Sequence, residues 1–373
     1  STGTGRFGNW LENLNDWNLS RSRYWGTPLP IWRTGPYGPL MEECVGAIGE
    51  FTEKNAYYIT ETCLDENGNR YDGHSLRKYL GEMRLQGENV NNVWNDLIRS
   101  KKVIFFASLP KEQIDLHRPF VDYAIFFRNG QVMARELDLI DVWFDSGSMP
   151  YAQWHYPFEN KEMVDDGKSF PADFIAEGVD QTRGWFFTLH AISTMIKGSV
   201  AYKNVVSNGL VLDKDGLKMS KRLGNAADPF ETMGTYGADA TRWYMITNAP
   251  PWDNLKFDVD GITEVQRKYF RALHNSYSFF ALYANVDTFT HSEELIPLAK
   301  RPEIDRWVIS RLNSLVQEVE ESFETYEPTR AGRAIQDFVM DELSNWYVRL
   351  CRRRFWKGDY SEDKIAAYQT LYQ

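Results

Sequence analysis

A short basic loop, DGLKMSKRLGN at residues 215–225, gathers cations near the middle of the chain. Lys218, Lys221 and Arg222 fall within five residues, with a glycine on either side, although the whole chain carries a net charge of −10. Solvated lysines on a surface turn are the ordinary explanation of such a run. A strand end that leads into a glycine-flanked loop and then into a helix is nevertheless the geometry of a phosphate-binding site. Two ammonium groups there would neutralise the charge that develops on a triphosphate as pyrophosphate leaves.

The elements around this loop predict a parallel α/β sheet. ADFIAEG (172–178) is typical of a buried strand, and TRGWFFTLHAISTMIKG (182–198) of a helix that ends at its last glycine. NVVSNGLVLD (204–213) predicts a second strand, and DPFETMGTYG (228–237) a second helix with an Asp cap and Pro in its first position. Ligands of such sheets lie at the carboxyl ends of the strands. The basic loop and the turn EGVDQTRGW (177–185) both follow such ends.

Two further regions flank this α/β segment, and 373 residues are enough for more than one domain. Residues 33–140 mix strand-like runs with a hairpin signal at Asn129-Gly130, which predicts an α+β insertion. Beyond residue 254 the apolar residues recur in steps of three and four, which predicts helices. One such stripe runs through Ile304, Val308, Leu312, Leu315, Val319 and Phe323, and another through Ile335, Val339, Leu343, Trp346 and Leu350. We place the domains at 1–254, a helical connector at 255–300 and a helical domain at 301–373, with the strand–helix part of the first at 172–254.

The composition argues against several classes of protein. The three cysteines are far apart without a CxxC pair, and the six histidines form no spaced cluster, so we predict neither a disulfide framework nor a protein-bound metal. Reduced thiols favour a cytoplasmic protein. No apolar run approaches the length of a membrane span, and we expect no membrane partner.

Four blocks of this sequence resemble a known family. KMSKR (218–222) is similar to the KMSKS signature of class I aminoacyl-tRNA synthetases. DWNLSRSRYWGTPLPIW (16–32), DVWFDSGSMPYAQW (141–154) and FIAEGVDQTRGWFFTL (174–189) look like the isoleucyl-tRNA synthetases in particular. With the helical tail SNWYVRLCRRRFW (344–356), the resemblance covers nearly the whole chain. It implies ATP with Mg²⁺, isoleucine and tRNA(Ile) as partners, formation of isoleucyl-adenylate, and transfer of isoleucine to the tRNA, by an enzyme expected to be a monomer.

The resemblance assigns roles position by position. The catalytic positions, which bind ATP and stabilise the adenylation transition state, are Lys218, Ser220 and Lys221. Arg222 stands where the family often has Ser and keeps a cation there. The ATP site is expected to include Asn208 and Gly209 as well. The positions that hold the amino acid and the adenylate are Glu177, Gly178, Asp180 and Gln181, with Trp185 and Trp143 as walls of the isoleucine pocket. Without the resemblance, the two acids are as well explained by a helix N-terminus, and Trp185 by the core.

The tail has a local excess of positive charge. Residues 328–358 carry seven Lys and Arg against three Asp and Glu. Arg349, Arg352 and Arg353 share a helical face near Trp346 and Trp356, and cations beside aromatic rings suit phosphate contact and base stacking on RNA. A solvated face of a helix bundle is the alternative. The resemblance favours binding of tRNA by Trp346, Arg349, Arg352 and Arg353.

The family pattern is incomplete within these residues. Class I synthetases carry an HIGH motif in the first half of a split nucleotide-binding fold, and no such motif occurs here. The chain starts without Met, and the editing insertion of the family would precede its first block. We therefore expect the second half of a Rossmann-like α/β catalytic domain with an α+β insertion, followed by part of an all-α anticodon-binding bundle, and no activity from this part alone. A valyl enzyme, or a tRNA-binding derivative of a synthetase without catalysis, remains as the alternative.

Overall fold

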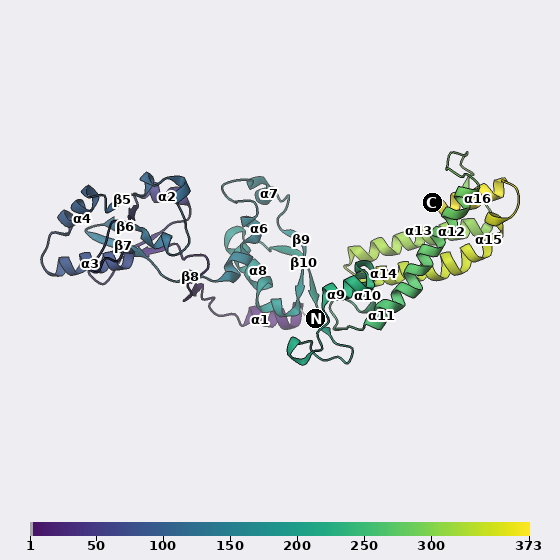
Figure 1. The fold of residues 1–373 in the computed structure, drawn as a ribbon, viewed down its shortest axis with the longest axis horizontal. Coiled ribbons are helices and arrows are strands. Elements are labelled where there is room, and N and C mark those ends of the chain that lie inside the picture. The colour runs from purple at the N-terminus through teal and green to yellow at the C-terminus, as the bar shows by residue number, and fades with distance from the viewer. Residues whose placement is uncertain (1–2) are drawn as a thin grey trace. The chain divides into compact units, whose positions relative to one another are not determined.

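The computed structural model describes residues 3–373, which are drawn as a ribbon in Figure 1. These residues form two compact units. Unit 1 contains residues 3–172 and 182–201, and unit 2 contains residues 173–181 and 202–373. The mixed segment 33–140 therefore belongs to unit 1. The basic loop and the helices that follow it belong to unit 2.

A six-stranded sheet lies at the centre of the mixed segment, with the strand order β3-β2-β7-β6-β4-β5 and antiparallel neighbours throughout. Asn129 and Gly130 close the β6–β7 hairpin with φ values of 50° and 73°, because a primed two-residue turn needs positive φ at both central positions. The predicted hairpin is confirmed. The strands are β2 (Ile31–Arg33), β3 (Glu42–Cys44), β4 (Tyr57–Ile59), β5 (Val103–Phe105), β6 (Ala124–Arg128) and β7 (Gln131–Arg135).

Both faces of this sheet are covered by apolar cores. Neighbouring residues of β6 point to opposite faces, so Phe126 belongs to one core and Ile125 to the other. α3 packs against β7, and Trp94 of α4 stacks on Phe127 with ring centres 4.1 Å apart. The covering elements are α2 (Ile48–Glu53), α3 (Gly73–Leu85), α4 (Val90–Arg99) and the 3₁₀ turns η2 (Phe106–Ser108), η3 (Lys111–Gln113) and η4 (Phe120–Tyr123).

The remaining elements of unit 1 are mostly helical. α5 packs against α8 so closely that a Cβ added to Gly147 would lie 2.9 Å from the carbonyl oxygen of Thr188. α8 ends at Gly198, whose φ of 61° gives the left-handed cap that the sequence predicted. The elements are η1 (Gly3–Phe7), α1 (Gly8–Glu12), β1 (Ser20–Arg21) paired with β8 (Leu139–Ile140), α5 (Val142–Gly147), α6 (Met149–Ala152), α7 (Lys161–Asp165) and α8 (Trp185–Lys197).

The strands of unit 2 differ from the prediction at two points. The strand at 172–178, predicted to be buried, is exposed or half-buried along its whole length. β9 (Ala172–Gly178) pairs with β10 (Tyr202–Asn208), but the single strand predicted over 204–213 is wrong. The chain changes partner at Gly209, where a Cβ would lie 2.2 Å from the carbonyl oxygen of Asp253, so no ordinary strand residue fits. After this point β11 (Val211–Leu212) pairs in parallel with β12 (Leu255–Lys256).

The rest of unit 2 is helical, and Figure 1 shows its long helices side by side as a bundle. Asp228 caps α9 by accepting from the amides of Phe230 and Glu231 at 2.8 and 3.0 Å, as predicted. The helical elements are η6 (Lys221–Leu223), α9 (Pro229–Tyr236), α10 (Ala238–Asn248), α11 (Val259–Val265), η7 (Gln266–Phe270), α12 (Arg271–Val286), η8 (Leu298–Lys300), α13 (Glu303–Glu324), α14 (Pro328–Asp337), η9 (Phe338–Val348), α15 (Arg349–Trp356) and α16 (Glu362–Tyr372).

The predicted apolar stripe of the last long helix is wrong in its second half. Trp346 and Leu350 are exposed, whereas Tyr347 and Cys351 are buried in the bundle core. The reason is that η9 is a π-helical segment between two α-helices. Its wider turns, with bonds from residue i to i+5, shift the phase of the side chains away from the period of 3.6 residues on which the prediction depended.

Candidate functional site

The basic loop begins with a tight turn that Asp213 organises. The amide of Asp213 donates to the carbonyl of Leu217 at 2.9 Å, and its carboxylate accepts from the amides of Asp215 and Leu217 at 3.1 and 2.7 Å. Gly216, with φ of 86°, supplies the left-handed turn residue. The next residue of the loop, Lys218, forms a β-bridge with Leu212. The turn therefore brings Lys218 back beside the end of β11.

The signature residues follow this turn directly. Lys218 is exposed, and Ser220 is half-buried. The Oγ of Ser220 accepts from the amide of Arg222 at 3.2 Å, while its own amide donates to Oδ1 of Asn225 at 2.9 Å. The side chain of Lys221 lies outside the described part of the structure.

Asn208 and Gly209 lie where β10 ends. The amide of Gly209 donates to the carbonyl of Pro251 at 2.8 Å, and the next amide, of Leu210, donates to Oδ1 of Asn254 at 2.8 Å. The segment from Pro251 to Asn254 therefore holds the backbone that leads into the basic loop. Because Gly209 has no room for a side chain, this close approach requires glycine.

The predicted amino-acid turn lies at the carboxyl end of β9. Glu177 and Asp180 are exposed there, and Asp180 accepts from Nε2 of Gln181 at 3.0 Å. A Cβ on Gly178 would lie 2.6 Å from Oδ1 of Asp180, so the carboxylate folds back over the glycine. Two carboxylates and an amide are thus presented at a strand end, where they suit an ammonium group or ribose hydroxyls.

The two predicted tryptophans belong to unit 1. Trp185 begins α8, is half-buried, and donates from Nε1 to the carbonyl of Ser146 in α5 at 3.0 Å. Trp143 lies on α5 and leaves 39% of its surface exposed. Packing in the core therefore explains part of the Trp185 side chain, which is half-buried, and little of the more exposed Trp143 side chain. The structure brings the helices of these two residues into contact.

The predicted RNA-binding residues lie on a continuous helical rod, η9 followed by α15. Trp346 is 55% exposed, and Arg349, Arg352 and Arg353 are all exposed. Within residues 3–373 the side chains of these three arginines form no hydrogen bond or ion pair, so their charges stay available to a partner. The next residue, Arg354, behaves differently because it points into the bundle.

Comparison with known proteins identifies the family. The profile described as "tRNA synthetases class I (I, L, M and V)" matches residues 1–96 and 88–258, and that described as "Anticodon-binding domain of tRNA ligase" matches residues 305–373. The chain belongs to the class I tRNA synthetases. The predicted fold, an α/β catalytic segment followed by a helical anticodon-binding segment, is thereby confirmed.

Relatives and solved structures agree with this assignment. The isoleucine–tRNA ligase of Porphyromonas gingivalis is 61% identical over the whole chain, and that of Thermus thermophilus is 45% identical over 99% of it. The chain spans only 30% of the length of each. The LeuRS–tRNA–LeuAMS complex of Agrobacterium radiobacter matches the whole chain, and 42% of its own, with a TM-score of 0.60. At 17% identity that likeness concerns the fold alone.

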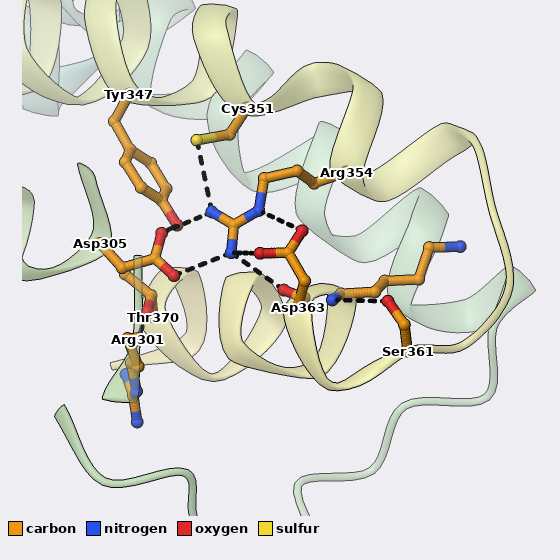
Figure 2. Close-up of polar contacts among 9 residues, drawn as sticks. Arg301, Asp305, Tyr347, Cys351, Arg354, Ser361, Asp363 and Thr370 are labelled. Atoms are coloured by element: carbon orange, nitrogen blue, oxygen red, sulfur yellow. Dashed lines mark hydrogen bonds and ion pairs between the residues drawn. The ribbon is translucent and has the colours of Figure 1, made fainter. Parts of the chain in front are cut away.

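The helical segment of this synthetase chain contains a buried polar cluster around Arg354 (Figure 2). Arg354 donates to both carboxylate oxygens of Asp305, at 2.6 and 2.9 Å, and to Asp363 at 3.0 Å. Asp305 is fully buried and also accepts from the hydroxyl of Tyr347 at 2.9 Å. Burial alone would lower the pKa of Arg354, but the bonds to Asp305 and Asp363 outweigh it and raise that pKa. The cluster joins α13, η9, α15 and α16.

Sequence reasoning missed three residues that organise the site. Asp213 and Asn225 hold the two ends of the basic loop together, and Nδ2 of Asn225 donates to Oδ2 of Asp213 at 2.8 Å. Asp141 caps α5 and accepts from Nε1 of Trp17 at 3.0 Å. Only Asp141 could have been found from the local sequence, because it directly precedes a helix, as N-cap residues do. Nothing in the sequence pattern pairs Asp213 with Asn225.

Among the carboxyl groups of the α5 region, Asp145 has the clearest change in pKa. Partial burial of this otherwise exposed side chain raises its pKa, and a hydrogen bond from Thr27 Oγ1 at 3.2 Å offsets part of that effect. The side chain shares its neighbourhood with Asp141, whose charge raises the pKa further.

Residues 3–373 contain neither a metal-binding cluster nor a membrane-spanning helix. No group of three or more His, Cys, Asp or Glu side chains is arranged to hold a metal ion among these residues. None of the helices described there combines the length and the apolar composition that a membrane span requires.

Proposed function

We propose that the protein containing this chain is an isoleucine–tRNA ligase that activates isoleucine with ATP and transfers it to tRNA(Ile). The observation that carries the proposal is the 61% identity to an isoleucine–tRNA ligase along all 373 residues. That alignment includes the basic loop and the strand-end turn. A valyl enzyme is the alternative within the family, and a tRNA-binding protein without catalysis is the alternative outside it.

The basic loop supplies the electrostatic part of this function. Lys218 is exposed on a loop whose backbone is held by hydrogen bonds, so its ammonium group is free to meet a nucleotide triphosphate. With Lys221 and Ser220 it would stabilise the charge that develops as pyrophosphate leaves. Asn208 and Gly209, at the end of β10, would line the same ATP site. Mg²⁺ would enter with ATP as part of the nucleotide substrate.

The strand-end turn and the tryptophans supply recognition of the amino acid. The carboxylates of Glu177 and Asp180 would hold the α-ammonium group and ribose hydroxyls, with Gln181 donating or accepting beside them. Gly178 lets the carboxylate of Asp180 fold back over the turn, because a Cβ there would lie 2.6 Å from Oδ1 of Asp180. Trp143 and Trp185 would bound the isoleucine side chain.

The exposed rod of η9 and α15 would bind tRNA. Arg349, Arg352 and Arg353 offer unpaired cations to phosphates, and Trp346 offers a ring for base stacking. We further propose a monomeric, cytoplasmic enzyme, with residues 1–254 as catalytic segment, 33–140 as its insertion, 172–254 as its strand–helix part, 255–300 as connector and 301–373 as the start of the anticodon-binding domain. The 373 residues alone are proposed to be inactive.

The decisive experiment is ATP–pyrophosphate exchange by the whole protein with isoleucine or valine. We expect isoleucine to give the higher kcat/KM, and Lys218→Ala to lower kcat about a hundredfold or more, as loss of one transition-state contact does. Lys214→Ala is the matched control, because Lys214 is exposed in the same turn and outside the signature. Preference for valine would favour the valyl enzyme, and no exchange with either amino acid would favour the non-catalytic alternative.

Binding of tRNA is tested separately. Arg353→Ala should weaken tRNA binding and reduce the slope of log K against log salt by about 0.7–0.9 per lost phosphate contact. Arg353→Lys keeps the charge and should keep the slope. An unchanged slope in the alanine variant would remove Arg353 from the interface.

A further inference from the structure

The two ends of the basic loop are joined by one side-chain pair, Asp213 and Asn225. Oδ1 of Asp213 accepts from the amides of Asp215 and Leu217, at 3.1 and 2.7 Å, and Oδ2 accepts from Nδ2 of Asn225 at 2.8 Å. Three donors therefore occupy this carboxylate. We call the pair of Asp213 and Asn225 the loop clasp.

The orientation of the Asn225 amide is fixed from both sides. Its Nδ2 donates to Asp213, and at 3.3 Å to the carbonyl of Lys218, while its Oδ1 accepts from the amide of Ser220 at 2.9 Å. A carboxylate can only accept and a backbone amide can only donate, so turning the Asn225 side chain over would break both contacts at once.

These contacts reach the backbone of the signature itself. The clasp holds the carbonyl of Lys218 and the amide of Ser220, and the glycines at 216 and 224 both have positive φ, at 86° and 69°. Fixing each residue of a flexible chain costs conformational entropy. A loop that is ordered before ATP arrives does not take that cost from the binding energy of the transition state.

We propose that Asp213 and Asn225 are positioning residues of the adenylation reaction, which act through Lys218 and Ser220 by fixing the backbone of the basic loop. This inference rests on the proposed function. The three donors around Asp213 leave its carboxylate little capacity to bind another ligand. We therefore infer that Asp213 holds the loop backbone and does not contact the nucleotide. The hydrogen bond from Asn225 also lowers the pKa of Asp213, so the carboxylate stays ionised at neutral pH.

The test exchanges the two side chains. Asp213→Asn places two amide NH₂ groups against each other, and Asn225→Asp places two carboxylates against each other. The double variant restores one donor and one acceptor at that contact. Its new amide oxygen at position 213 still accepts from the two backbone amides, and its new carboxylate at position 225 still accepts from the amide of Ser220. The total charge equals that of the wild type. The one change for the worse is at the carbonyl of Lys218, which loses its 3.3 Å donor and faces a carboxylate oxygen instead, so recovery is expected to be incomplete.

We expect each single variant of the whole protein to lower kcat of isoleucine-dependent ATP–pyrophosphate exchange at least tenfold, with KM for isoleucine within twofold of the wild type. The double variant should return to within about threefold of wild-type kcat. Asp215→Asn is the control, because its exposed carboxylate accepts no hydrogen bond within the described residues. A double variant no better than the worse single variant, or single variants with wild-type kcat, would overturn the inference.

A second readout separates this inference from the proposed function. Hydrogen exchange of the loop amides, above all that of Ser220, should be at least tenfold faster in each single variant and slow again in the double variant. If the wild type shows no isoleucine-dependent exchange of pyrophosphate, the proposed function fails, and with it the catalytic role of the clasp. If the wild type is active and loop hydrogen exchange does not change in the single variants, only the clasp is refuted.

Discussion

Replacement of Arg354 by alanine should strongly destabilise the helical segment. The substitution removes both charged donors that reach Asp305, at 2.6 and 2.9 Å, and leaves the hydroxyl of Tyr347 as the remaining side-chain donor to a carboxylate that has no exposed surface. Breaking a buried ion pair by removing one partner costs about 3–5 kcal/mol. That is a large part of the roughly 5–15 kcal/mol by which folded proteins are stable.

An exposed pair on the same helices provides the matched control. Arg311 of α13 donates three hydrogen bonds to the carboxylate of Glu342 in η9, at 3.0, 2.9 and 2.6 Å, but half of its side chain is exposed. Arg311→Ala should therefore cost about 1 kcal/mol or less, because solvent screens such pairs. Each variant deletes an arginine side chain that donates to a carboxylate. The two sites differ in burial, and Arg354 has a second carboxylate partner, Asp363.

Hydrogen exchange with mass spectrometry measures the effect in the whole protein, on peptides of α13 and α16. A loss of 3–5 kcal/mol speeds exchange by roughly two to four powers of ten, whereas the control should change it less than tenfold. The double variant Arg354→Ala, Asp305→Asn should recover a substantial part of the loss, because it no longer buries an unpaired charge. Equal effects of Arg354→Ala and Arg311→Ala, or no recovery in the double variant, would refute the reasoning.

Three further predictions concern the rest of the chain. Gly209→Ala should lower the free energy of unfolding by about 1–3 kcal/mol and raise KM for ATP, because the new Cβ would lie 2.2 Å from the carbonyl oxygen of Asp253. Gly234 faces open space, so Gly234→Ala should be neutral or slightly stabilising in the same denaturation and kinetic assays. In peptide mapping after iodoacetamide treatment of the native protein, exposed Cys44 should be alkylated and the two buried cysteines protected, since burial raises the pKa of both thiols. Asp145→Asn should stabilise the protein against urea at pH 7, because the pKa of Asp145 is raised in the folded protein and ionisation therefore costs stability as pH rises through that pKa. The advantage of the Asn variant should shrink as pH falls toward 4, where Asp145 becomes protonated.

The sequence determined those features that depend on neighbours along the chain. The Asn129-Gly130 hairpin, the cap of α9 at Asp228 and the end of α8 at Gly198 were all predicted, because each needs only the conformational preference of one or two residues. The signature blocks belong to the same kind of information. They identify a family by order and spacing, without any knowledge of contacts.

Contacts between distant residues were decided only by the tertiary structure. Arg353 and Arg354 are adjacent and chemically identical, yet one is exposed and the other is buried against Asp305, 49 residues earlier in the sequence. The π-helical segment η9, which turns Trp346 outward and Tyr347 inward, likewise escapes a count based on 3.6 residues per turn.

The basic loop shows both kinds of information at one site. Its lysines and glycines could be recognised in the sequence, because their types and spacing match the signature of the family. The clasp could not, because Asp213 and Asn225 are ordinary turn residues until the chain brings them within 2.8 Å. The steric requirement for Gly209 likewise depends on Asp253, a residue that approaches it only in the folded chain. Residue types along the chain determined what chemistry the loop offers, and folding alone decided which groups hold it in place.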